Sequence, residues 1–215
     1  MSVRCIMKEP VCTHSKNICE LLLPDSENSR LCLRMEFPHF DGEDKGFRRI
    51  NAFYEKRQKR LSDYYTHKTT QIGKMFADGK DPVFPSSITL SYRITLDTDE
   101  IKSIFFTSET VIDGKVYRYY SAESWNVRNG YIIMLSDVVP TVGKYRWELF
   151  DRLYDECVAL PRSYFPDLRR RLRRYYSPDN FYFTDNGIAV FYQPGTICDA
   201  SYGLISIRIE TESGQ

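Results

Sequence analysis

The sequence has few of the residues on which acid–base and metal chemistry usually depend. Histidine occurs three times among the 215 residues, at His14, His39 and His67, so none lies in the later two-thirds of the chain. Cysteine catalysis needs a base beside the thiolate. No histidine pairs in any motif with Cys157, which lies on an apolar helical stripe, or with Cys198, which is expected to be the more exposed thiol. The sequence therefore predicts no catalytic residue and no cofactor, and it favours a non-enzymatic protein.

Long apolar runs are also missing. No stretch approaches the roughly 18 apolar residues of a membrane span, and the opening MSVRCIMKEPVCTHSK lacks the apolar core of a signal peptide. The six cysteines are therefore expected to be reduced thiols. The first three, at positions 5, 12 and 19, lack the close spacing of a zinc knuckle, so no metal site is predicted. These features predict a cytoplasmic protein without a membrane span.

Strand patterns dominate the middle and the end of the chain. From Ile88 to Leu96 apolar residues alternate strictly with polar ones, which is typical of a strand buried on one face. Asp113-Gly114 and Asn129-Gly130 favour two-residue primed turns, and Asp185-Asn186-Gly187 is a similar tight turn. Consecutive strands joined at such turns form antiparallel hairpins.

Three helices are predicted between these strands. From Glu43 to about Thr66 apolar residues recur at helical spacing, and a second apolar stripe runs from Leu149 to Cys157. Pro166 and Asp167 open a third helix. The predicted fold class is α+β: an antiparallel β-sheet of meander hairpins, with the long N-terminal helix and two further helices packed on it.

The predicted domain organisation is a flexible segment over residues 1–16 followed by a single α+β domain over residues 17–215. A division into subdomains 17–80 and 81–215 is the alternative. At 215 residues the chain is long enough to bury a full core in either arrangement.

Positive charge gathers in two segments. Residues 43–80 carry ten Lys or Arg against five Asp or Glu, and residues 161–178 carry six Arg against one Asp. The second segment supplies four candidate binding residues on the exposed arc of the third helix: Arg169, Arg170, Arg173 and Arg174. They suit a polyanion such as a nucleic acid or an acidic glycan, unless they only form a solvated helix face. Contact between the two basic segments would favour binding.

Aromatic and acidic residues supply the remaining candidates. Tyr119 and Trp125 are predicted to belong to a sugar- or protein-binding face, because flat rings gain contact area at little entropic cost; packing under a helix is the alternative. The acidic pairs Glu109/Asp113 and Asp97/Asp99 have the residue types of a glycosidase, but sequence spacing does not show two carboxylates facing across a cleft.

The order of elements resembles the extracellular domain of the RsiV-like family, a domain of unknown function found in lysozyme-sensing anti-sigma factors and beside a cell-wall deacetylase. The matching stretches are Phe37–Gly42, Trp125–Asp137, Phe181–Ile188 and Gly203–Glu210. The resemblance implies an α+β fold and a binding role in a bacterial protein. The Gly-Gly-Ala-His segment common in the family is replaced here by Tyr117–Glu123, so lysozyme binding is not carried over.

The predicted function is therefore a non-catalytic protein-binding or regulatory module. Its sheet edge, or the loop at Gln193–Ser201, is expected to engage a protein partner. One alternative is an enzyme or accessory domain acting on cell-wall polysaccharide, which requires two facing carboxylates in a cleft. The second alternative is nucleic-acid binding through the arginine-rich helix, but overall neutrality, with a net charge of +1, argues against that partner.

Overall fold

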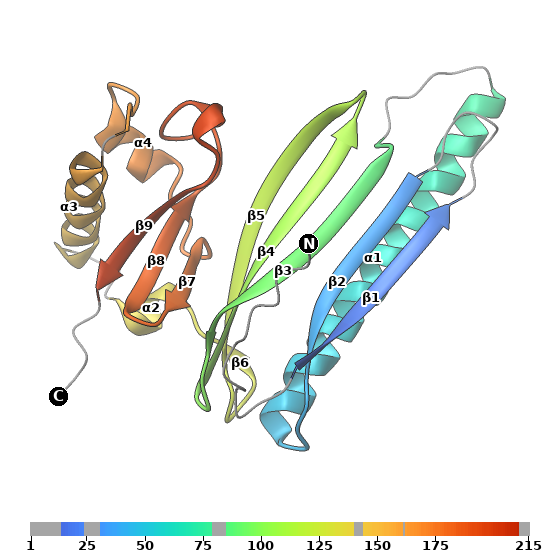
Figure 1. Cartoon of the computed structure of the whole chain (residues 1–215), viewed down its shortest axis with the longest axis horizontal. Helices are drawn as coiled ribbons and strands as arrows, with labels where there is room; N and C mark the ends of the chain where they lie inside the picture. Colours follow the sequence, from blue (N-terminus) through green and yellow to red (C-terminus); the bar gives the residue numbers. More distant parts are fainter. Residues whose placement is uncertain (1–13, 24–30, 79–84, 140–143, 161, 211–215) are drawn as a thin grey trace, which may run out of the picture.

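A computed structural model describes residues 14–23, 31–78, 85–139, 144–160 and 162–210 (Figure 1). In these residues six strands form one sheet in chain order: β1 (His14–Leu23), β2 (Leu31–Phe40), β3 (Ser87–Asp97), β4 (Ile101–Ile112), β5 (Lys115–Asn126) and β6 (Tyr131–Ile132). A second sheet contains β7 (Phe181–Thr184), β8 (Gly187–Tyr192) and β9 (Ile205–Glu210). The helices are α1 (Lys45–Ala77), α2 (Leu135–Val138), α3 (Lys144–Ala159), α4 (Leu168–Arg174) and the short 3-10 helix η1 (Ala200–Tyr202). Of the predicted flexible segment, residues 1–13 lie outside the described part, and β1 begins at His14.

The α+β class is confirmed, and most neighbouring strands are antiparallel hairpins. Two features differ from the prediction. First, β2 and β3 are parallel, because α1 carries the chain back along the sheet before β3 begins, and a helical crossover joins parallel strands. Second, the strands form two sheets, and α3 contacts β9 and α4 and so packs beside the smaller sheet (Figure 1). The prediction that all helices pack on one antiparallel sheet is therefore wrong.

Helix α1 buries the first half of its apolar stripe against the larger sheet. Phe47, Ile50 and Tyr54 are buried together with residues of β2, β3 and β4. Leu61 and Tyr65, further along the stripe, are only half-buried. The helix extends to Ala77, beyond the predicted end near Thr66. Residues 66–71, directly after the stripe, are all polar, so the apolar pattern that defines the first half does not mark where the helix ends.

The start of α1 makes a close backbone contact with the turn between β5 and β6. A Cβ atom added to Gly46 would lie 1.6 Å from the carbonyl oxygen of Val127, and one added to Gly130 would lie 2.6 Å from the carbonyl oxygen of Gly46. Arg49 holds the same turn, since its guanidinium donates to the carbonyl of Asn129 at 3.0 Å. Two residues without side chains thus let the helix approach the turn closely.

Strand β4 is buried on both faces. Ile104 and Phe106 lie in the core under α1, whereas Phe105 packs against Tyr182 and Phe191 of the smaller sheet. A chain of hydroxyl groups lies where the sheets meet. Ser103 Oγ is 2.9 Å from Ser124 Oγ and accepts a hydrogen bond from the backbone N–H of Phe183 at 3.0 Å.

A separate core lies between the smaller sheet and helices α3 and α4. The predicted α3 stripe is buried here at Leu149, Phe150, Leu153 and Cys157, and α4 adds Leu168 and Leu172. Tyr192 closes this core from β8, and its hydroxyl donates to the carbonyl of Leu172 at 3.0 Å. Each sheet therefore has its own helical cover.

We expect the substitution Gly46→Ala to lower the free energy of unfolding by about 2 kcal/mol or more, because the added methyl group overlaps the Val127 carbonyl. Helix propensity alone predicts the opposite sign, since alanine is favoured over glycine by about 1 kcal/mol inside a helix. Urea unfolding measures the change. Lys45→Ala, at the exposed neighbouring position, is the matched control and should stay within about 0.5 kcal/mol. An unchanged or raised midpoint for Gly46→Ala would contradict the close contact.

Candidate binding surfaces

The outer edge of β5 is open along most of its length. Strand β6 pairs only with Trp125 and Asn126 at the end of β5. In the part of the chain that the structure describes, no strand pairs with the preceding residues on that side. In an antiparallel pair, alternate residues point their N–H and C=O groups away from the partner strand. The register with β4 and the contacts of Tyr120 place Val116, Arg118, Tyr120 and Ala122 in this outward set.

The side chain of Gln193 covers one position of this edge. Its Oε1 accepts a hydrogen bond from the backbone N–H of Tyr120 at 3.0 Å, and its Nε2 donates to the carbonyl of Tyr120 at 2.7 Å. A single amide thus makes the two hydrogen bonds that a residue of an added strand would make. The predicted loop at Gln193–Ser201 and the predicted sheet edge therefore meet at Tyr120.

Tyr119 lies on this edge, 60% exposed, beside the exposed Val116 and Tyr117. A hollow of about 290 Å³ begins at Tyr119 and is lined by residues of β5, by Ile132–Met134 and by the segment before β7. Trp125 does not share this surface. It is 3% exposed, and its Nε1 donates to the hydroxyl of Tyr54 at 2.8 Å. Its prediction as a binding residue is wrong, because it packs under α1.

The arginines of α4 mostly hold α4 to its surroundings. Arg169 contacts Asp151 of α3 at 2.7 Å and lies 3.8 Å above the ring of Tyr154. Arg173 lies 4.5 Å above the ring of Trp147 of α3. In these contacts the positive charges of Arg169 and Arg173 interact with residues of α3.

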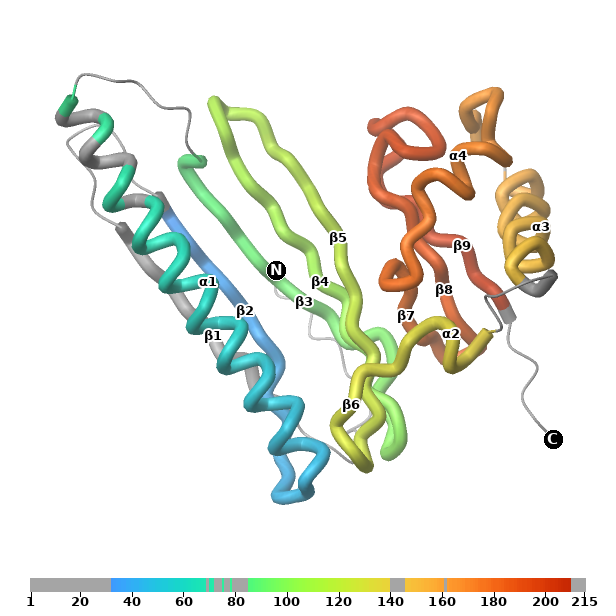
Figure 2. The backbone as a smooth tube through the Cα atoms, turned by 180° about the vertical axis from the view of Figure 1, so that it is seen from behind, coloured from blue at the N-terminus to red at the C-terminus, as the bar shows by residue number. Residues whose placement is uncertain are grey.

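The remaining candidate arginines differ from this pair. Arg174 lies 5.4 Å from the ring centre of Tyr175, its neighbour in the chain. Arg170 is exposed and has no ion pair within the described residues. The two basic segments also lie at opposite ends of the molecule, with both sheets between α1 and α4 (Figure 2). The structure therefore does not bring the two basic segments together.

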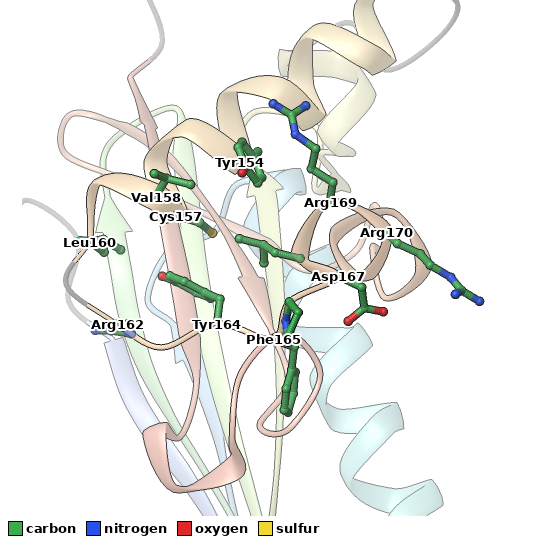
Figure 3. A pocket seen from close by; sticks show the side chains of 12 residues that line it. Tyr154, Cys157, Val158, Leu160, Arg162, Tyr164, Phe165, Asp167, Arg169 and Arg170 are labelled. Atoms are coloured by element: carbon green, nitrogen blue, oxygen red, sulfur yellow. The ribbon is translucent and has the colours of Figure 1, made fainter.

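A larger pocket of about 560 Å³ lies between the end of α3 and the start of α4 (Figure 3). We call it the α3–α4 pocket. Cys157 and Tyr164 form part of its inner wall. Burial raises the pKa of the Cys157 thiol to about 11 and that of the Tyr164 hydroxyl to about 12, so both groups are neutral at pH 7. Cys198, expected to be exposed, is buried at 1% exposure, because it forms a β-bridge with Tyr164.

In each acidic pair considered from the sequence, one carboxylate binds a basic side chain. Asp97 accepts a hydrogen bond from the buried ammonium of Lys102, and Glu109 accepts one from Arg118 at 2.6 Å. Asp113 occupies the β4–β5 turn with φ of +49°, as expected for the predicted primed turn. Within the described residues, no three His, Cys, Asp or Glu side chains gather as metal ligands would. Cys5 and Cys12 lie outside that part.

The fold is that of an α+β protein, and no described helix is both long and apolar enough to cross a membrane. Residues 166–212 match the family model described as "Protein of unknown function (DUF3298)". The match covers α4 and the smaller sheet, where the motifs of the predicted resemblance are concentrated. A search of curated proteins finds no match.

Two solved structures are similar over nearly the whole chain. A member of the DUF3298 family from Bacteroides fragilis aligns with a TM-score of 0.72 and 14% identity, covering 94% of this chain and 91% of that one. A DUF3298 family protein from Pseudomonas aeruginosa aligns with a TM-score of 0.61 and 14% identity, with the same coverage of 94% and 91%. At this identity the likeness shows a shared fold.

We expect Gln193→Ala to expose the backbone groups of Tyr120. The free energy of unfolding should fall by about 1–2 kcal/mol, and the Tyr120 amide should exchange its hydrogen at least about tenfold faster, because its acceptor is lost. Hydrogen exchange followed by NMR measures both effects. Gln71→Ala, at an exposed position of α1, is the control and should change neither value. Unchanged exchange at Tyr120 would show that Gln193 does not cover the edge in solution.

The described thiols should differ in reactivity. Cys32 is exposed, whereas Cys157 and Cys198 are buried with raised pKa values, so little thiolate forms at pH 8. Iodoacetamide applied to the native protein at pH 8 should modify Cys32 at least about tenfold faster than the other two, as mapped by mass spectrometry. In urea all three should react alike. Rapid native labelling of Cys157 would contradict its burial. Counting six free thiols in protein denatured without reductant would support the predicted cytoplasmic compartment.

Proposed function

We propose that this chain is a non-catalytic protein-binding module that receives an extended segment of a partner along the outer edge of β5. The observation that carries the proposal is the pairing of Gln193 with Tyr120, because an amide already occupies the hydrogen-bonding position of an added strand. Strand addition of this kind draws its affinity from main-chain hydrogen bonds and its specificity from neighbouring side chains.

The side chains beside the edge suit such a partner. Val116 and the rings of Tyr117 and Tyr119 are exposed on the two faces of β5, where alternate side chains of an added strand would lie. The hollow beside Tyr119 offers room for one partner side chain. Natural sheet edges are usually blocked by charge, proline or a covering segment. Here, among the described residues, the hydrogen bonds that cover the edge come from Gln193, from the two residues of β6 and from Ile133, whose N–H donates to the carbonyl of Ser124 at 2.7 Å.

The arrangement of carboxylates supports a binding role over cell-wall hydrolysis, because one acid of each pair considered for catalysis, Asp97 or Glu109, binds a lysine or an arginine. The paired arginines of α4 argue in the same way against a nucleic-acid partner. We also propose that the chain is related to the bacterial RsiV-like proteins, which is a more specific relationship than the likeness to DUF3298 proteins. A cytoplasmic location remains a prediction.

Photo-crosslinking tests the proposed edge. A benzoylphenylalanine placed at Tyr119 should form one discrete adduct with a protein in lysate of the source cells. The adduct should disappear in Arg118→Pro, which removes an outward N–H without breaking a hydrogen bond to β4. It should persist in Arg118→Ala, which keeps the N–H and loses only the side-chain contact with Glu109.

The same photo-reactive residue at Tyr64, exposed on α1, is the positional control and should not yield that adduct. An adduct that survives Arg118→Pro, or one that forms equally from Tyr64, would refute strand addition at β5. Turnover of a cell-wall glycan by the purified protein would favour the enzymatic alternative.

A further inference from the structure

The α3–α4 pocket combines an apolar interior with a positively charged rim. Its apolar lining is contributed by Val158, Leu160, Phe165 and Leu168, and Val158 is 60% exposed at its mouth. A valine so exposed at the entrance of a hollow leaves apolar surface in contact with water. At about 560 Å³ the pocket is in the range of roughly 300–1,000 Å³ that is usual for small-molecule sites.

The charges around the pocket do not cancel. Asp167, the carboxylate among the lining residues, accepts a hydrogen bond from Arg171 at 2.7 Å, and this contact lowers its pKa. Arg169 is likewise matched by Asp151. Arg162 and Arg170 are exposed at the rim and have no ion pair within the described residues. Two unmatched positive charges therefore border an apolar interior.

The inner wall adds no charge of its own. Cys157 and Tyr164 are uncharged at neutral pH, and burial raises the pKa of each group further. Arg169 and Arg170 extend outward from the rim in Figure 3, whereas Cys157 and Tyr164 lie on the inner side. A ligand with an apolar body and one charged end would match this division, because its charge would remain at the wet rim, where desolvation costs least.

We propose that the α3–α4 pocket binds a small amphipathic anion: an aromatic or aliphatic body carrying one terminal carboxylate or sulfonate. Arg162 and Arg170 lie on opposite sides of the pocket (Figure 3), so the anionic end lies at the rim beside one of these two arginines. This site is separate from the β5 edge, and it gives two of the arginines near α4 a role that helix packing does not explain. An exposed arginine that gains a carboxylate partner forms a charge-assisted hydrogen bond, stronger than a neutral one.

Two fluorescent probes of similar shape separate charge from hydrophobicity. Anilinonaphthalene sulfonate carries the anion, and N-phenylnaphthylamine lacks it. We expect the full chain to bind the sulfonate at least about tenfold more tightly than the neutral amine, as measured by fluorescence titration. The double variant R162Q/R170Q should lose about tenfold in affinity for the sulfonate and keep its affinity for the amine. Decanoate should displace the sulfonate, and decanol should compete much less.

Two further variants complete the test. Val158→Asp, which places a negative charge at the mouth, should weaken sulfonate binding at least about tenfold. Arg128→Gln, which removes an exposed arginine at the distant β5–β6 turn, should leave it unchanged. Unchanged thermal midpoints confirm that each variant is folded. Equal affinity for both probes, or sulfonate binding unaffected by R162Q/R170Q and Val158→Asp, would overturn the proposal. Neither result bears on the β5 edge.

Discussion

The architecture depends on the burial of β4 on both faces. Ile104 and Phe106 close the core under α1, and Phe105, between them in the chain, closes the contact with the smaller sheet. Alternation along a strand sends successive side chains to opposite faces, so three neighbouring residues can anchor two cores only if both faces are covered. The hydroxyls of Ser103 and Ser124 satisfy the polar groups at this junction, including the N–H of Phe183. The smaller sheet is therefore held in position by its contacts with Ser103 and Phe105 of β4.

This packing leaves the outer edge of β5 open along most of its length. Its end is fixed by Trp125 under α1 and by the close contact between Gly46 and the β5–β6 turn, whereas its beginning carries the exposed Tyr117 and Tyr119. A strand that is already paired along its other edge suits recognition, because little of its conformational entropy is left to lose when a partner adds to it. The α3–α4 pocket lies beside the other core and depends on different residues, so the two proposed sites are structurally independent.

The local patterns were sufficient for much of the fold. Strict alternation between Ile88 and Leu96 identified β3, the Asp113-Gly114 turn has the expected positive φ values, and Leu168 and Leu172 face the core as predicted. The errors concern residues whose environment is supplied by distant segments. The sequence around Trp125 is compatible with an exposed aromatic side chain, but its ring nitrogen donates a hydrogen bond to Tyr54 of α1. Cys198 lies in a predicted loop but forms a β-bridge with Tyr164. No local signal distinguishes these cases.

The sequence by itself determined the α+β class, the hairpin turns and the apolar stripes of the helices, because these depend on backbone preferences and on spacing along a few residues. Only the tertiary structure decided that the strands form two sheets, that β2 and β3 are parallel, and which arginines are matched by acids. It also decided that Gln193 reaches Tyr120 and that the rim of the α3–α4 pocket retains Arg162 and Arg170 unmatched. These outcomes depend on contacts between residues far apart in the chain, whose pairing spacing alone does not specify.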